Sequence, residues 1–319
     1  MEASLEQRIL ELLKDNLMSV SQVASTLGIR KDVAAAYLES LRQQGKLELF
    51  EVGKSKVYIL PRKPIEVKKP RIIGIVSGKG GVGKTVVAIN LTAALTFFGK
   101  NAIAIDADLK MSGLGLQLGM YYFPVTLNDV IKDNKSILNA IYIHSSGLRI
   151  IPASLSINPV DISSLPKFLS LPYFEDSILI VDSPPGLETN AKKVLKVCKE
   201  VILVTLPEIP SLTNVLKLIE ACKESNVKPL GIIVNRYRKD KHQLRIQEIE
   251  KVCELPVFGV IPEDKNIIKS IYKRYPLVFL NPYSKTALEF KKIAARLLGF
   301  NYKPGFGSRV KNLFWRLRR

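Results

Sequence analysis

The stretch Ser77-Gly78-Lys79-Gly80-Gly81-Val82-Gly83-Lys84-Thr85 decides how the rest of this 319-residue chain can fold. An apolar run typical of a buried strand, Ile72 to Val76, precedes it, and a helix-compatible run begins at Val86. Strand, glycine loop and helix in this order are the setting of a phosphate-binding loop. Its glycines let successive backbone N–H groups face a polyphosphate, and the helix N-terminus adds the positive end of its dipole.

The side chains of this stretch suit a nucleotide and its metal ion. Lys84 supplies a point charge for the β- and γ-phosphates, and Thr85 brings a hydroxyl group to Mg²⁺. A second lysine, Lys79, lies inside the loop, where most phosphate loops have none. We expect ATP to bind at Gly78, Gly80, Gly81, Val82, Gly83, Lys84, Thr85 and Val86.

Composition narrows the class of protein. No apolar run reaches about 18 residues, so we expect no transmembrane helix. The start Met1-Glu2-Ala3 does not resemble a secretory signal, which predicts a cytoplasmic protein. The three cysteines form no C-x-x-C pair, so buried reduced thiols are expected rather than a zinc or iron–sulfur site.

The net charge of +19 is unevenly distributed. Residues 1–60 contain eight basic and eight acidic side chains, whereas 61–71 have a net charge of +4. The last stretch, 303–319, adds six basic residues and no acidic one. The basic excess therefore lies in a linker and a tail as well as in the main body.

Residues 1–60 read as a small domain of three helices followed by a two-stranded hairpin, which is the winged-helix order. Two interpretations stay open for it. Arg30, Lys31, Arg42, Lys54 and Lys56 could contact DNA phosphates. A module for protein interaction or dimerisation is favoured, because the domain has no net charge and non-specific DNA affinity depends on neutralising phosphates.

A proline- and lysine-rich linker over 61–70 separates this domain from a larger one over 71–302. The larger domain alternates short apolar runs with stretches of helical length. This alternation predicts an α/β fold with a mostly parallel, doubly wound sheet. The expected strands are Ile72–Val76, Ala102–Ile105, Leu148–Ile151, Ile178–Val181, Val201–Thr205, Leu230–Val234 and Val257–Val260.

Polar residues follow three of these runs, where an open parallel sheet binds its ligands. Asp106 and Asp108 follow the second run, and Asp182 follows the fourth in the place of an acid that holds Mg²⁺ through water. Gly186, just beyond, could sense the γ-phosphate through its N–H. Asn235 and Arg236 end the sixth run and suit the edge and the face of adenine.

With these motifs, residues 71–300 resemble the MinD/ParA family of deviant Walker-A ATPases. The resemblance implies an ATP-dependent homodimer in which Lys79 reaches the partner's phosphates. It also implies that Asp108 positions the attacking water, that Thr85, Asp106 and Asp182 serve Mg²⁺, and that Lys84 binds phosphate. A later loop containing Pro262 and Glu263 would lie near adenine together with Asn235.

Two positions depart from the family pattern. The family often has a second threonine where this chain has Val86, and commonly an asparagine near Gly113. A side-chain contact to the α-phosphate and the switching triggered by a partner could therefore differ, but the groups needed for ATP and Mg²⁺ are all present.

The basic stretch over 303–319 has the pattern of an interfacial helix. Val310, Leu313, Phe314 and Leu317 fall on one helical face, and Trp315 suits the headgroup boundary. We expect it to bind an anionic membrane surface, with packing on the body and nucleic-acid binding as the alternatives.

The expected function is a MinD-like ATPase, peripherally associated with the inner face of the cell membrane, that positions or recruits partners. An activating protein or cargo is expected but not identified by the sequence. One alternative is a ParA-like partition ATPase that binds DNA through residues 1–60. Another is a non-enzymatic regulator in which the N-terminal unit is the effector and the bound nucleotide serves mainly as a dimerisation signal.

Overall fold

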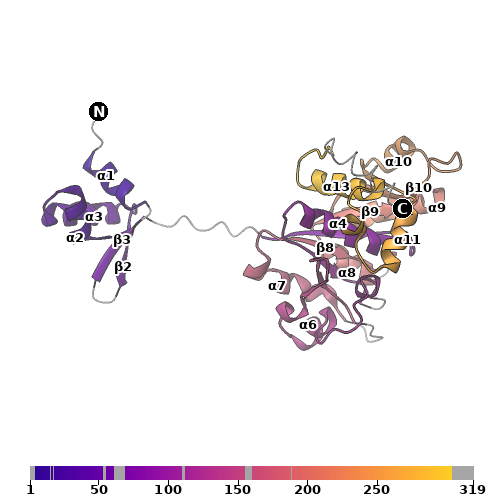
Figure 1. Cartoon of the computed structure of the whole chain (residues 1–319), viewed down its shortest axis with the longest axis horizontal. Coiled ribbons are helices and arrows are strands. Elements are labelled where there is room, and N and C mark those ends of the chain that lie inside the picture. The colour runs from indigo at the N-terminus through magenta and orange to yellow at the C-terminus, as the bar shows by residue number, and fades with distance from the viewer. Residues whose placement is uncertain are drawn as a thin grey trace. The chain divides into compact units, whose positions relative to one another are not determined.

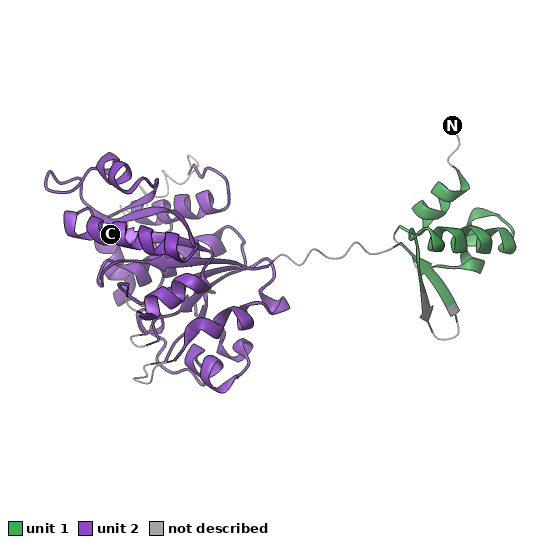
Figure 2. Cartoon of the chain, turned by 180° about the vertical axis from the view of Figure 1, so that it is seen from behind, with its two compact units in different colours: residues 1–67 green, residues 68–319 purple. Residues whose placement is uncertain are grey.

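The computed structural model describes residues 4–14, 16, 18–52, 55–60, 69–109, 112–154, 160–187 and 189–303, with the backbone alone for 50–52 and 55. The chain divides into two compact units, 1–67 and 68–319 (Figure 2). The predicted membrane-binding residues Val310, Leu313, Phe314, Trp315 and Leu317 lie outside the described residues.

The first unit contains helices α1 (Leu5–Leu12), α2 (Val20–Leu27) and α3 (Lys31–Gln43), then strands β2 (Glu48–Val52) and β3 (Ser55–Ile59). A short strand β1 (Met18–Ser19) pairs antiparallel with β3. The side chains of Ser4 and Ser19 accept hydrogen bonds from the first turns of α1 and α2, so both helices begin at capping boxes. The elements follow the order that the sequence predicts, whereas the winged-helix assignment stays a prediction.

The second unit is built on an eight-stranded sheet with the order β11-β10-β9-β4-β8-β5-β7-β6. The mostly parallel sheet that the sequence predicts is confirmed, since only the edge strand β6 runs antiparallel to its neighbour. The strands are β4 (Arg71–Val76), β5 (Ala102–Asp106), β6 (Tyr142–Ile143), β7 (Arg149–Ile151), β8 (Ile178–Asp182), β9 (Glu200–Thr205), β10 (Lys228–Tyr237) and β11 (Val257–Pro262).

Helices cover both faces of this sheet (Figure 1). Because of this cover, the central strands β5 and β8 are buried along their whole length. One face packs against α4 (Lys84–Phe97), α5 (Leu114–Gln117), α11 (Lys265–Tyr272), α12 (Leu277–Leu280) and α13 (Lys285–Leu297). The other packs against α6 (Leu127–Asp133), α7 (Leu165–Leu169), α8 (Thr189–Val197), α9 (Ile209–Glu224), α10 (Ile246–Cys253) and the 3₁₀ turns η1 (Ile137–Ala140), η2 (Ile162–Ser164) and η3 (Pro172–Phe174).

The three cysteines, Cys198, Cys222 and Cys253, are buried and unbridged, as predicted. Burial raises the pKa of the Cys198 thiol to about 12, so this group stays protonated at neutral pH. Across the residues that the structure describes, no helix is both long and apolar enough to span a bilayer.

Candidate nucleotide site

The phosphate-binding loop joins the end of β4 to the start of α4. Gly83 is the N-cap of α4 with a φ of 94°, a left-handed conformation that favours glycine. No side chain caps this helix, so the N–H groups of its first turn are free of a side-chain acceptor. The loop and the helix start can therefore present backbone donors to an anion, as the sequence predicts.

Two glycines let the loop pack closely against neighbouring elements. A Cβ atom on Gly78 would lie 2.3 Å from the Cβ of Asn214 in α9, and one on Gly83 would lie 2.4 Å from Nδ2 of Asn235 at the end of β10. Real Cβ atoms do not approach so closely. The loop is thus held from two sides by segments that are distant in sequence.

Asp106 organises the segment that follows β5. It is fully buried, and its Oδ2 accepts hydrogen bonds from the Ser112 hydroxyl at 2.8 Å and from the N–H groups of Gly113 and Leu114 at 3.1 Å. Its Oδ1 accepts one from the N–H of Asp108 at 3.1 Å. The sequence predicted Asp106 as a magnesium-shell acid; its hydrogen bonds give it the further task of holding Asp108 in place.

Asp182 faces Asp106 across the β5–β8 pairing and is 2% exposed. The neighbouring Thr85 hydroxyl acts to lower its pKa. Its Oδ1 is buried and has no hydrogen-bond partner among the described residues. An orphaned carboxylate oxygen beside a hydroxyl is a donor set that suits Mg²⁺, which completes its shell with water and phosphate oxygens. The residues therefore fit the predicted metal.

Burial controls the ionisation of this site. Lys84 is 8% exposed, and burial lowers its pKa, opposed by the charges of Asp182, Asp108 and Asp106. Burial raises the pKa of Asp106 to about 6. Burial and then repulsion by Asp106 raise the pKa of Asp182 to about 7, against the attraction of Lys84. A cation bound beside these carboxylates would lower both of their pKa values.

Lys79 pairs with a residue outside its own loop. Its ammonium group forms an ion pair with Glu208 at 2.5 Å, and Ser211 also donates to that carboxylate at 2.9 Å. Glu208 lies at the start of α9, 129 residues beyond Lys79. The hydrogen bond from Lys79, then that from Ser211, lowers the pKa of Glu208. Sequence reasoning missed this pairing, although a glutamate after a predicted strand was its signal.

The predicted base-recognition residues lie at the ends of β10 and β11. Asn235 is 7% exposed, and its Nδ2 donates to the carbonyl of Val82 at 2.7 Å, so it also supports the phosphate loop. Arg236 is exposed, with a φ of 55°. The N–H of Glu263, next to Pro262, donates to the carbonyl of Tyr237 at 3.1 Å and joins the two strand ends.

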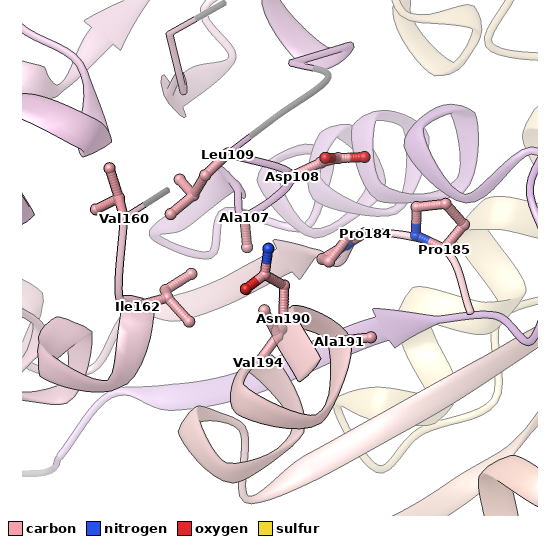
Figure 3. A pocket seen from close by; sticks show the side chains of 10 residues that line it. All are labelled: Ala107, Asp108, Leu109, Val160, Ile162, Pro184, Pro185, Asn190, Ala191 and Val194. Carbon is pink, nitrogen blue, oxygen red and sulfur yellow. The ribbon is translucent and has the colours of Figure 1, made fainter. Parts of the chain in front are cut away.

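Gly186 contacts the first residue of the phosphate loop: its N–H donates a hydrogen bond to the carbonyl of Ser77 at 2.9 Å. Asp108 lines a cavity of about 180 Å³ that lies between the ends of β5 and β8 and the start of α8 (Figure 3). None of the phosphate-loop residues lines this cavity. Its lining is Ala107, Asp108, Leu109, Val160, Ile162, Pro184, Pro185, Asn190, Ala191 and Val194.

This fold and loop occur in known proteins. Residues 73–277 match the model of the CobQ/CobB/MinD/ParA nucleotide binding domain. An uncharacterized ATP-binding protein of Methanocaldococcus jannaschii is 37% identical over 255 residues, which cover 76% of this chain and 97% of that protein.

Two solved structures are similar to the second unit. The cell division ATPase MinD of Pyrococcus furiosus is 35% identical with a TM-score of 0.67, and the match covers 72% of this chain and 98% of that chain. The septum site-determining protein MinD of Pyrococcus horikoshii OT3, solved with Mg-ADP, is 36% identical with a TM-score of 0.67; coverage is 72% of this chain and 96% of that chain. The second of these holds a magnesium nucleotide on the same fold.

Proposed function

Because the chain belongs to the CobQ/CobB/MinD/ParA family of nucleotide-binding domains, we propose that it is a Mg²⁺-dependent ATPase whose ATP-bound form is a homodimer on a membrane surface. The observation that carries this proposal is the combination of a complete phosphate loop with a second lysine, Lys79, that is paired with Glu208 at the start of α9. A lysine in that position is suited to leave Glu208 and reach a second molecule.

Each residue near the loop has a proposed task. The backbone of residues 78–86 and the ammonium group of Lys84 bind the phosphates. Thr85 and Asp182 hold Mg²⁺, which neutralises developing charge on the phosphates when it is bound. Asp108, positioned by Asp106, orients the attacking water. Asn235 and the loop with Pro262 and Glu263 border the base, and Arg236 stacks on it.

The membrane part of the proposal rests on the sequence of the tail. One short basic amphipathic helix binds an anionic bilayer weakly, whereas two in a dimer bind much more strongly, because the second insertion is intramolecular. ATP therefore recruits the dimer to the inner face of the membrane, and hydrolysis releases it. This cycle would position or recruit a cargo, and a protein activator would stimulate the hydrolysis step.

The second candidate, DNA partition through residues 1–60, is less well supported. In the described part of that unit, Arg30 pairs with Asp32, Arg42 with Glu39 and Lys46 with Glu6. Side chains that already have carboxylate partners contribute less to phosphate neutralisation. The unit is better suited to contact a protein.

A pair of variants tests the ATPase proposal. Lys84→Ala should lose tight nucleotide binding, because Lys84 carries the one ammonium group that is buried among the described residues of the loop. Asp108→Ala should bind ATP like the wild type, accumulate as a dimer and hydrolyse ATP at least about a hundredfold more slowly. Fluorescent-nucleotide titration, light scattering and phosphate release measure the three properties, with exposed Asp133→Ala as the control. Normal turnover of Asp108→Ala would show that another group positions the water.

Vesicle sedimentation tests the membrane step separately. Full-length protein should pellet with anionic vesicles in ATP and much less in ADP, whereas a chain truncated after Phe306 should stay in the supernatant. Equal binding by both chains would remove the tail from the proposal.

A further inference from the structure

Helix α11 exposes apolar side chains that no described residue covers. Ile268 is 66% exposed and Tyr272 is 85% exposed, and they are spaced i, i+4 on one side of the helix. The opposite side is packed inward, with Ser270 buried and Ile267 against the core. The outward side of α11 therefore presents apolar side chains that the described residues leave largely exposed.

An aromatic loop extends this surface. Tyr121 and Tyr122 are 61% and 83% exposed. The Arg274 guanidinium lies over the Tyr121 ring, 5.2 Å from its centroid, and a Cβ atom on Gly119 would lie 2.3 Å from the Arg274 Cδ. The loop and the C-terminal end of α11 are thus in contact. We call Tyr121, Tyr122, Ile268, Tyr272 and the cations Lys265, Lys273 and Arg274 the α11 patch.

The charge of the α11 patch is of one sign. Lys265, Lys273 and Arg274 are exposed, and the sequence from 265 to 275 contains no acidic residue. Among the described residues, neither lysine forms an ion pair. The nearest carboxylate in sequence, Asp264, is already occupied: its Oδ1 accepts from the N–H of Asn266 at 2.9 Å and its Oδ2 from the Thr286 hydroxyl at 2.6 Å.

We propose that the α11 patch is a second membrane-contact surface, which lays exposed tyrosine and isoleucine side chains on the headgroup region of an anionic bilayer. Tyrosine rings favour this boundary, and lysine and arginine side chains are attracted to anionic headgroups. Charge complementarity selects the lipid over a neutral or basic protein surface. The proposal rests on the membrane association proposed above.

The last described residues lie on the side of the sheet that carries the patch. The helices α4, α11, α12 and α13 pack on one face, and the chain leaves that layer where Phe300 and Tyr302 pack against Phe98 at the end of α4. Residues 304–309, which precede the expected tail helix, reach roughly 20 Å when extended, about the length of α4. A tail inserted in a bilayer can therefore bring the patch to the same surface, where its contact becomes intramolecular.

A single-tryptophan reporter tests the patch in the full-length chain. The chain has one tryptophan, Trp315, in the tail. Combining Trp315→Phe with Tyr272→Trp moves the reporter to the α11 patch. Combining Trp315→Phe with Tyr173→Trp gives the matched control, because Tyr173 is 45% exposed in η3, outside the patch. Each protein is mixed with ATP and with phosphatidylglycerol-containing vesicles, with or without brominated acyl chains.

The patch reporter should shift to the blue with anionic vesicles and be quenched at least about twofold by brominated lipid, while the Tyr173→Trp reporter should show neither effect. An unquenched patch reporter, with native Trp315 still quenched, would overturn this proposal and leave the tail's role intact. Failure of native Trp315 to respond would instead contradict the tail part of the proposed function. A blue shift caused by ATP without vesicles would assign the patch to a protein interface and also overturn the proposal.

Charge variants provide a second measurement. Lys265→Gln and Lys273→Gln should each weaken binding to anionic vesicles about fivefold, and more at low salt than at high salt. Lys132→Gln, an exposed lysine in α6 on the other side of the sheet, is the matched control and should bind like the wild type. Equal affinities for all three variants would contradict the electrostatic part of the proposal.

Discussion

Lys79 and Lys84 lie in the same loop but in different surroundings. Lys84 is 8% exposed among three carboxylates, whereas the side chain of Lys79 is 36% exposed and paired with one glutamate. An ion pair this exposed contributes at most about 1 kcal/mol to stability, so it can open without unfolding its surroundings. We therefore propose that Lys84 serves the site of its own chain and that Lys79 serves the site of a partner.

This difference predicts how Lys79→Ala behaves. The variant should bind ATP within about threefold of the wild type, because Lys79 pairs with Glu208, yet it should remain a monomer when ATP is added. Nucleotide titration and light scattering measure the two effects, with Lys84→Ala as the comparison. A loss of ATP affinity as large as that of Lys84→Ala would place Lys79 in its own site.

Lys291 is a buried residue with an effect on stability. It is 1% exposed, its ammonium group lies 3.8 Å from the Phe97 ring centroid, and it donates to the carbonyl of Pro282 at 2.9 Å. Burial lowers its pKa from 10.5 to about 8. Between these values the unfolded chain binds more protons than the folded one, so this residue makes stability rise with pH over that interval.

We expect Lys291→Met to remove that pH dependence. The free energy of unfolding of the variant minus that of the wild type should fall by about 2 kcal/mol between pH 7 and pH 9.5. Urea unfolding at both pH values measures it, and the exposed Lys292→Met controls for the loss of one positive charge. A difference that is constant with pH would mean that Lys291 is charged throughout this range.

At the scale of elements, the phosphate loop is positioned by α9 and β10 as much as by its own strand and helix. Gly78 touches the backbone of α9, since a Cβ atom there would meet the Asn214 carbonyl oxygen at 2.9 Å. Asn235 bonds the loop from the end of β10. The loop conformation therefore depends on helix and strand packing that its glycine pattern does not encode.

Two alanine substitutions in the same loop should separate these effects. Gly78→Ala should lower the free energy of unfolding by about 2–3 kcal/mol, because its Cβ overlaps α9. Gly80→Ala should change it by less than about 1 kcal/mol, because its Cβ would meet only Pro185, at 3.9 Å. Thermal or urea unfolding without nucleotide gives both values. Equal losses would show that the loop is not packed against α9.

The strands were more predictable than their partners in space. All seven predicted apolar runs form strands of the sheet, because strands buried on both faces leave a continuous apolar record in the sequence. The edge strand β6 was not predicted: its residue Ile143 is 68% exposed, and two residues give no periodicity to detect.

At the scale of the whole molecule, the two units have separate hydrophobic cores. The first is built around Ile9, Leu38 and Leu41, and the second contains both core layers of the large sheet. A domain of about 60 residues buries a smaller fraction of its surface on folding than a larger domain does, and it is only marginally stable. The first unit should therefore unfold independently of the second.

Removal of residues 1–67 tests this independence. The remaining chain should bind ATP within about twofold of the full-length protein, since every residue of the nucleotide site lies in 68–319. Calorimetry should show a small transition in the full-length chain that is missing from the truncated one. Loss of ATP binding on truncation would mean that the first unit supports the site.

The phosphate loop, the alternation of strands and helices, and the carboxylates at strand ends could all be predicted from the sequence, because each is a pattern of contiguous residues. The folded arrangement of the chain decided that Lys79 pairs with Glu208, 129 residues away, and that Asn235 donates a hydrogen bond to Val82 across 153 residues. It also decided that one oxygen of Asp182 is left without a partner among the described residues. These contacts depend on strand order, which sets β4 between β8 and β9, and no local pattern specifies that order.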